Sequence, residues 1–100
     1  MITNINRIIH EPGRQLILIY LCSAEKVDFT YLKRETGMTQ GNLSSHLNKL
    51  ETEGYIRSEK SFINKRPLTI FRITDEGKNV FKEYVKEMHL YFSDLINLVK

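Results

Sequence analysis

Short polar side chains gather on one face of a helix predicted over residues 39–54. Leu43, Leu47 and Leu50 recur at helical spacing on one side, and the opposite side carries Gly41, Asn42, Ser45, Asn48, Lys49 and Thr52. Glu and Lys commonly line a solvated helix, whereas short amides and hydroxyls can approach the edges of DNA bases and hydrogen-bond to them. The sequence therefore predicts a base-contacting helix, with candidate DNA contacts at Thr39, Gln40, Gly41, Asn42, Ser44, Ser45, His46 and Lys49.

Two of these candidates have a second interpretation. Gly41 costs roughly 1 kcal/mol of helix propensity relative to alanine, which suggests close approach to a partner. Early helical positions also accept glycine without a functional reason. His46 lies at the edge of the polar side, where it either contacts a phosphate or packs beside Leu50. The sequence leaves both alternatives open.

A basic segment follows this helix. Four basic residues and one acid, Glu59, lie between Arg57 and Arg66. Residues 55–62 and 68–74 are rich in β-branched and aromatic types, so they predict two strands joined by a turn at residues 64–67. Lys65 and Arg66 then lie at the tip of a hairpin, where long cations can reach phosphates or the minor groove.

Local signals predict two helices at the start of the chain. Ile5, Ile8 and Ile9 recur at helical spacing, and Pro12 suits the first turn of a second helix that ends near residue 23. This second helix is apolar on most sides, as expected for a helix buried among others.

A helix-turn-helix pattern comes next. Val27 indicates a very short strand, and residues 29–36 suit a short helix with Asp28 or Thr30 as its cap. Gly37 stands where a left-handed terminator belongs, and the polar helix begins directly after the turn. Two helices joined by a short glycine turn form this motif.

The last predicted helix is longer than a small domain needs. Thr74 followed by two acids marks its start, and a helix over residues 75–100 would extend roughly 39 Å at 1.5 Å for each residue. The apolar stripe along its far half therefore needs to be buried by another surface, and a second copy of the chain supplies that surface most simply. The predicted dimer interface comprises Ile5, Ile8, Ile9, Tyr84, Met88, Tyr91, Phe92, Leu95, Leu98 and Val99.

Composition limits the remaining possibilities. With 100 residues, 41% hydrophobic and 27% charged, residues 1–100 should form a single α+β, mainly helical domain with one core. The net charge of +3 favours polyanionic partners. No stretch resembles a signal peptide or a membrane span, and no phosphate loop, nucleophile elbow or catalytic triad is evident. We expect a cytoplasmic protein that is not an enzyme and contacts no membrane.

The sequence offers poor metal ligands. Cys22 stands alone in an apolar run and is expected to be buried, which also fits a reducing compartment. His10, His46 and His89 are scattered and lack the short spacings of metal sites. We therefore predict neither a cofactor nor a metal site.

One long stretch resembles the winged helix-turn-helix regulators of the ArsR and MarR type. It reads TYLKRETGMTQGNLSSHLNKLETEGYIRSE, followed by RPLTIFRITDEGK. The matching positions are Leu32, Gly37, Ser44, His46, Leu47, Leu50, Glu51, Gly54, Tyr55, Ile56, Lys65, Arg66, Thr74 and Gly77. Lys33 departs from the pattern, because the family commonly has a small alanine there. The resemblance implies a winged helix with a two-stranded wing and its recognition helix in the major groove.

The motifs together predict a homodimeric transcriptional regulator that binds double-stranded DNA at a near-palindromic site. A winged-helix module for protein–protein interaction without DNA binding is the alternative, since this fold hosts both uses. The sequence indicates no effector ligand and no residues that would bind one.

Overall fold

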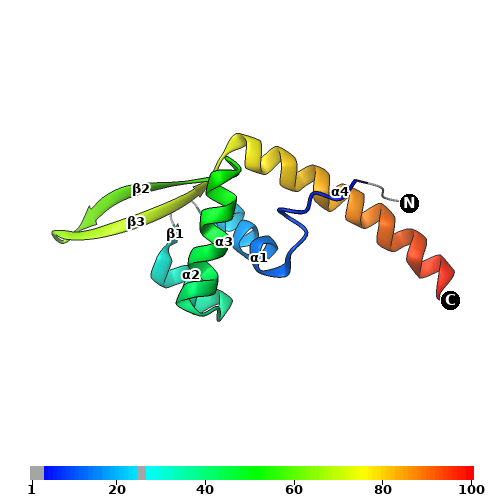
Figure 1. Cartoon of the computed structure of the whole chain (residues 1–100), viewed down its shortest axis with the longest axis horizontal. Helices are drawn as coiled ribbons and strands as arrows, with labels where there is room; N and C mark the ends of the chain where they lie inside the picture. Colours follow the sequence, from blue (N-terminus) through cyan, green and yellow to red (C-terminus); the bar gives the residue numbers. More distant parts are fainter. Residues whose placement is uncertain (1–3, 25–26) are drawn as a thin grey trace.

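The computed structural model describes residues 4–24 and 27–100 and has the predicted winged-helix architecture (Figure 1). Helices and strands follow one another in the order α1 (Pro12–Ser23), β1 (Val27–Asp28), α2 (Phe29–Thr36), α3 (Gln40–Thr52), β2 (Ile56–Ile63), β3 (Arg66–Ile73) and α4 (Asp75–Leu98). The strands form an antiparallel sheet in the order β1-β3-β2. The fold is thus mainly helical with one small sheet, as the sequence predicts.

Side chains cap the starts of the helices. Asp28 accepts a hydrogen bond from the backbone N–H of Tyr31 at the start of α2, which decides between the two predicted caps. Thr39 caps α3 and Thr74 caps α4, both as predicted. These caps are local in sequence, so the pattern alone could locate the helix starts.

The buried side of α3 packs into the core as its spacing predicts. Leu43, Leu47 and Leu50 are buried together with apolar residues of α1, α2 and the sheet. Burying an aliphatic side chain of this size contributes about 1.5–3 kcal/mol, so the three leucines fix which side of α3 faces solvent. The expectation that Cys22 is buried is wrong, because its side chain is exposed in the last turn of α1.

The wing is a longer hairpin than predicted. Its turn consists of Asn64 and Lys65 alone, both with positive φ, and Ile63 pairs with Arg66. Positive φ at both central positions is typical of the two-residue turn whose twist suits a hairpin. The placement of Arg66 and Pro67 in the turn is therefore corrected, since both belong to β3.

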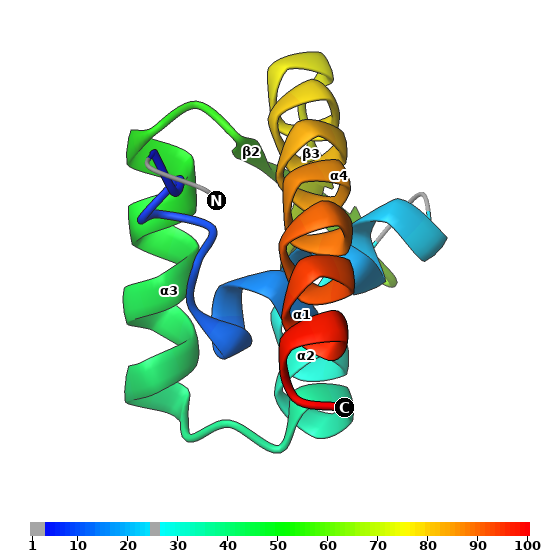
Figure 2. The same cartoon turned by 90° about the vertical axis from the view of Figure 1, so that its right-hand side faces the viewer.

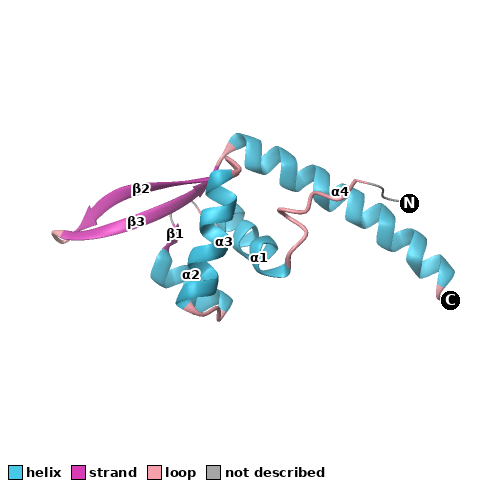
Figure 3. Cartoon of the chain, viewed as in Figure 1, coloured by secondary structure: helices cyan, strands magenta, loops and turns pink. Residues whose placement is uncertain are grey.

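The predicted helix at Ile5, Ile8 and Ile9 is absent. Residues 4–10 form a loop with one turn, in which the Asn6 side-chain oxygen accepts hydrogen bonds from the backbone N–H groups of Ile8 and Ile9. Such bonds offer the backbone an alternative to a helix. Ile5 and Ile8 pack against the core, and Ile9 is fully buried in it, so Ile9 has no surface for a second copy to cover. Figures 2 and 3 show this loop passing between α3 and α4.

The first half of α4 docks on the body and the second half projects from it (Figure 1). Tyr84 and Met88 are buried in the chain's own core, so they leave little surface for a second copy to cover. The Tyr84 hydroxyl lies 2.7 Å from His10 Nδ1 and accepts a hydrogen bond from Gln15 at 2.9 Å. Tyr91 and Leu95 are half-buried, and Phe92, Leu98 and Val99 are exposed. Of the described helices, none has the length and apolar character needed to cross a membrane.

Candidate nucleic-acid interface

The solvent-facing side of α3 carries the predicted polar residues. The polar face, defined as Gly41, Asn42, Ser45, Asn48, Lys49 and Thr52, is exposed at every position, as are Gln40 and Ser44 beside it. Thr39 is also exposed, and its hydroxyl accepts a hydrogen bond from the Asn42 backbone N–H at 3.2 Å. The amides, hydroxyls and ammonium group of this face therefore lie on an open helix surface that a partner can contact.

Gly41 has no packing partner that explains it. A Cβ atom built at this position meets nothing within 4 Å. The chain's own fold therefore does not require glycine here, and the predicted close approach to DNA stays a prediction.

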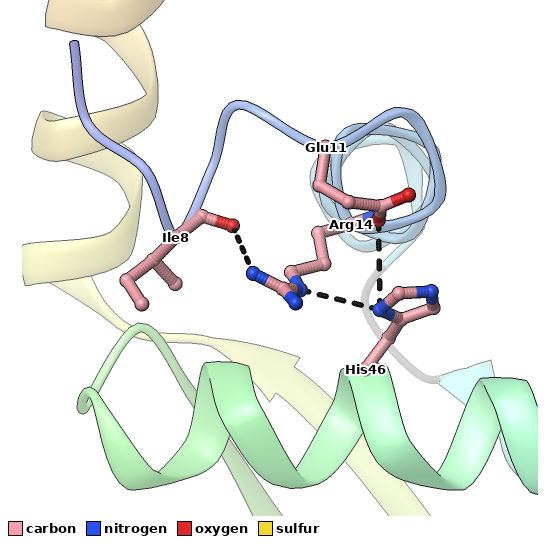
Figure 4. Close-up of polar contacts among 4 residues, drawn as sticks. All are labelled: Ile8, Glu11, Arg14 and His46. Carbon is pink, nitrogen blue, oxygen red and sulfur yellow. Dashed lines mark hydrogen bonds and ion pairs between the residues drawn. The ribbon is translucent and has the colours of Figure 1, made fainter.

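His46 faces α1 rather than the open surface (Figure 4). Arg14 Nε donates a hydrogen bond to His46 Nδ1 at 3.2 Å, and Glu11 Oε2 lies 3.5 Å from the same nitrogen. Arg14 also donates to the Ile8 carbonyl oxygen at 3.0 Å. Neither sequence interpretation of His46 anticipated this arrangement, which ties α3 to the start of α1 and to the loop before it.

The carboxylate in this cluster is held in its charged form. Burial opposes ionisation of Glu11, but hydrogen bonds from the backbone N–H groups of Gly13 and Arg14 favour it, and so do the charges of His46 and Arg14. Together they hold the pKa of the Glu11 carboxyl below its ordinary value. Glu11 is also the N-cap of α1, so one carboxylate serves the helix start and the contact with α3.

A second carboxylate joins α3 to the wing. Glu51 Oε2 accepts hydrogen bonds from the Ser58 backbone N–H at 3.0 Å and from the Ser58 hydroxyl at 2.6 Å. Ser58 lies on β2, the edge strand of the sheet, whose outward N–H groups need partners other than a strand. Sequence reasoning recognised Glu51 only as part of a motif. Nothing in its local spacing indicates that it meets β2.

The wing presents cations next to α3. Arg57, Lys60, Lys65 and Arg66 are all exposed, and Lys65 occupies the turn itself. Glu59 accepts a hydrogen bond from Arg72 at 2.6 Å across the hairpin. A groove of about 260 Å³ separates the wing from α3 and is lined by Ser44, Asn48, Glu51, Ser58 and Thr69, among others. Lys60 lies on the same face of β2 as Ser58, which is the face turned toward α3. Arg57 instead lines a hollow on the opposite side of the sheet, together with Arg72 and Lys78.

The described residues group no metal ligands. Residues 4–24 and 27–100 contain no cluster of three His, Cys, Asp or Glu side chains that could hold a metal ion. The side chains exposed on α3 and the wing supply hydrogen-bonding groups and charge through amides, hydroxyls and cations.

Comparison with known proteins gives the family. Residues 14–92 match the model of the winged helix DNA-binding domain. An uncharacterised protein of Methanocaldococcus jannaschii is 40% identical over 82 residues, covering 82% of this chain and 89% of the relative.

Solved structures agree with that family. A transcriptional regulator homologue from Pyrococcus horikoshii is 31% identical with a TM-score of 0.83, covering 90% of this chain and 89% of that one. A PadR family transcriptional regulator from Eggerthella lenta, 23% identical with a TM-score of 0.72, covers 89% and 84% and shares the fold. The predicted resemblance to winged helix-turn-helix regulators is confirmed, and the chain belongs to the family of winged helix DNA-binding domains.

Proposed function

We propose that this protein is a transcriptional regulator that binds double-stranded DNA in a sequence-specific manner. The observation that carries the proposal is the joint surface of α3 and the wing, in which the exposed polar face of the helix is accompanied by the exposed cations Lys60, Lys65 and Arg66 of the wing. In this arrangement α3 enters the major groove, and the wing contacts the backbone or the minor groove. We also propose a cytoplasmic location, as expected from the sequence.

The two parts of this surface have different tasks. Gln40, Asn42, Ser45 and Lys49 are the candidates for contacts with base edges, and Asn is able to pair with adenine through two hydrogen bonds. Lys65 and Arg66 supply attraction to phosphates that is independent of sequence. Glu51 and Ser58 hold the two parts in a fixed relation, so both grooves can be contacted at once.

We further propose that the protein acts as a homodimer formed by α4. Val85, Phe92 and Ile96 each expose half or more of their surface, and helical spacing places them on one stripe with Val99. Ile19 of α1 is also about half exposed, and it lines a groove together with Val85 and Phe92. A two-fold dimer would present two copies of α3 to half-sites one DNA turn apart, about 34–36 Å, and would so favour a near-palindromic site.

A salt titration tests DNA binding. The full chain is titrated against a random duplex by fluorescence anisotropy at several salt concentrations, and the affinity should fall steeply with salt. Replacing Lys65 and Arg66 with alanine should weaken binding to every duplex and reduce the salt slope by about one unit for each phosphate that the wing no longer reaches.

The matched control removes the same charge elsewhere. Lys82→Ala with Lys86→Ala takes two exposed lysines from α4 and should leave the slope close to that of the parent. If the wing variant binds random DNA as tightly as the parent at low salt, the assignment of the wing is wrong. If the parent binds no duplex at low salt, the alternative of a protein-interaction module replaces the proposal.

A further inference from the structure

The tip of the wing carries two large apolar side chains in open solvent. Phe62 is 72% exposed and Ile63 is 56% exposed, next to the turn formed by Asn64 and Lys65. Figure 1 shows the hairpin extending away from the helices, so the hydrophobic core does not cover the side chains at this tip. A phenylalanine in such a position offers a large, rigid apolar ring that a partner could bury.

Strand alternation determines which way Phe62 faces. Ser58, Lys60 and Phe62 lie on one face of β2, because side chains two residues apart share a face. Ser58 contacts Glu51 of α3, so this is the face turned toward the polar helix. Pro67 is the cross-strand partner of Phe62 and shares its face, whereas Ile63 lies on the opposite one.

Charge favours DNA as the occupant. Lys60, Lys65 and Arg66 surround the apolar tip and are exposed. Cations beside an apolar side chain suit a partner that offers phosphates around a stacked interior, as the minor groove does. A protein partner recognised through Phe62 would instead have to be acidic.

The reach of the wing also fits. Phe62 lies four residues beyond the contact between Ser58 and α3, which corresponds to about 13 Å along a strand. Adjacent major and minor grooves are roughly 17 Å apart along the duplex, half of one helical turn. With α3 in a major groove, a wing of this length is of the right order to extend toward the neighbouring minor groove.

We propose that Phe62, backed by Pro67, is an apolar wedge that enters the minor groove and bends the DNA. The proposal rests on the proposed function, because it requires that α3 occupies the adjacent major groove. Architectural proteins insert apolar side chains between base steps and kink the duplex by about 20–90° toward the major groove. The flanking cations hold the two phosphate backbones while Phe62 separates the bases.

The experiment measures the bend directly. A duplex selected by the parent protein from a random library carries a donor and an acceptor dye at its ends, and 2-aminopurine replaces adenine at successive steps beside the contacted site. Binding of the parent should raise energy transfer and the fluorescence of one 2-aminopurine. Phe62→Ala should abolish both changes and lower affinity about tenfold, since burial of the phenylalanine no longer contributes but the unstacking cost is avoided.

Two further variants and two control measurements make the result specific. Phe62→Leu keeps an apolar wedge and should retain most of the bend, and Ile63→Ala removes an exposed apolar side chain from the other face and should behave as the parent. The salt slope of Phe62→Ala should equal that of the parent, because the charge of the wing is unchanged. Circular dichroism of each variant establishes that the fold is intact.

The outcomes separate this proposal from the proposed function. If the parent binds DNA without changing energy transfer or 2-aminopurine fluorescence, the wedge is refuted and DNA binding stands. Equal bending of DNA by Phe62→Ala and by the parent also refutes the wedge. If Phe62→Ala sediments differently from the parent but bends DNA equally, the wedge is refuted and the tip is identified as a protein contact. If the parent binds no duplex at all, both proposals fail.

Discussion

Lys65 occupies a backbone position that favours glycine. Its φ of 65° follows the φ of 51° at Asn64, and left-handed backbone costs an ordinary L-residue about 1–2 kcal/mol. Asparagine is tolerated in that region, but a lysine is uncommon there. A lysine with strained backbone at the tip of an exposed hairpin is consistent with a role of its charge in binding, retained although the strain lowers the stability of the fold.

Lys65→Gly should therefore separate stability from binding. We expect the free energy of unfolding to rise by up to about 1 kcal/mol, because glycine relieves the strain at the cost of some entropy in the unfolded chain. DNA affinity should fall, and the salt slope should decrease by about one unit. Urea unfolding and anisotropy titrations measure the two effects. Lys65→Asn should act in the same direction, and a stabilised variant with full affinity would contradict the role of the charge.

Asn42→Ala should relax sequence preference more than it reduces nonspecific affinity. A good base contact contributes roughly 1–3 kcal/mol of discrimination against a wrong base, and Asn42 carries no charge that would hold phosphates. Selection from a random library compares the preferred sites of the variant and the parent. Asn79→Ala, which removes an exposed asparagine from α4, is the control. An unchanged preference at every position would remove Asn42 from the base-contacting set.

The solvent-facing positions of the candidate site were predictable where the signal lies within a single helix. Asn42 and Lys49 follow from the helical spacing of α3, because the leucines that fix its orientation lie in the same helix. The partners of Glu51 and His46 do not follow in this way. Glu51 contacts Ser58 of β2, and His46 contacts Arg14 of α1. These contacts depend on how the elements pack against one another, which the residue spacing within α3 does not indicate.

Helices α3 and α4 each contain a glycine in the first turns, for different reasons. A Cβ at Gly77 would overlap the backbone carbonyl oxygen of Tyr55, which also accepts a hydrogen bond from Thr74. At Gly41 a Cβ would meet nothing within 4 Å. Gly77 thus allows α4 to start against the turn that joins α3 to β2, whereas no contact within the chain requires a glycine at position 41.

The two alanine substitutions should have opposite effects on stability. Gly77→Ala should lower the free energy of unfolding by about 1–3 kcal/mol, because rigid backbone must move to admit the Cβ. Gly41→Ala should raise it by up to about 1 kcal/mol, since alanine is the better helix former. Thermal or urea unfolding measures both. If Gly41→Ala is more stable and binds DNA as tightly as the parent, the close approach of α3 at this position is refuted.

Ionised Glu11 connects α1 with α3, so stability should depend on pH through this group. Its lowered pKa in the fold means that it contributes stability above the ordinary carboxyl range and loses it as pH falls through its folded-state value. Glu11→Gln should cost about 1 kcal/mol near pH 7, and the difference should shrink as pH falls through the lowered folded-state pKa of Glu11. Urea unfolding at several pH values tests this. Glu87→Gln, an exposed position on α4, is the control, and a pH-independent difference would contradict the role of the charge.

Element positions were predictable where a cap or a break lies beside them in sequence. Thr39 and Thr74 start their helices as predicted, and Gly37 ends α2 with a left-handed backbone. The loop at residues 4–10 shows the limit. Its isoleucines have helical spacing, but Asn6 bonds the backbone and α4, far away in sequence, supplies part of the surface on which the loop packs.

The shape of the whole molecule explains why the dimer could be only partly predicted. The chain extends over 57 Å by 26 Å by 21 Å, with the wing at one end and the last turns of α4 at the other (Figure 1). Helical spacing indicated that α4 is too long for one core. It did not show that Tyr84 and Met88 already belong to that core, because their partners come from the start of the chain.

Phe92 tests the dimer without disturbing the core. Truncation after Glu87 would also remove the buried Met88, whereas Phe92 is about half exposed and lies on the stripe that continues through Ile96. Phe92→Glu should give monomers, because a carboxylate at the centre of an apolar interface loses its hydration without a partner. Leu90→Glu changes an equally apolar and exposed side chain on a different face of α4, and it should leave the dimer intact.

Sedimentation at micromolar concentration distinguishes these cases. The parent and Leu90→Glu should have twice the chain mass of 11.8 kDa, and Phe92→Glu should have the mass of one chain. The monomer should lose most of its specific affinity and keep weak nonspecific binding, because joining two half-site contacts multiplies affinity without adding any new contact. A Phe92→Glu variant that remains a dimer would show that the stripe through Phe92 does not join the two copies. A parent protein that sediments as a monomer would show that one wing and one α3 must account for all the DNA binding of the protein.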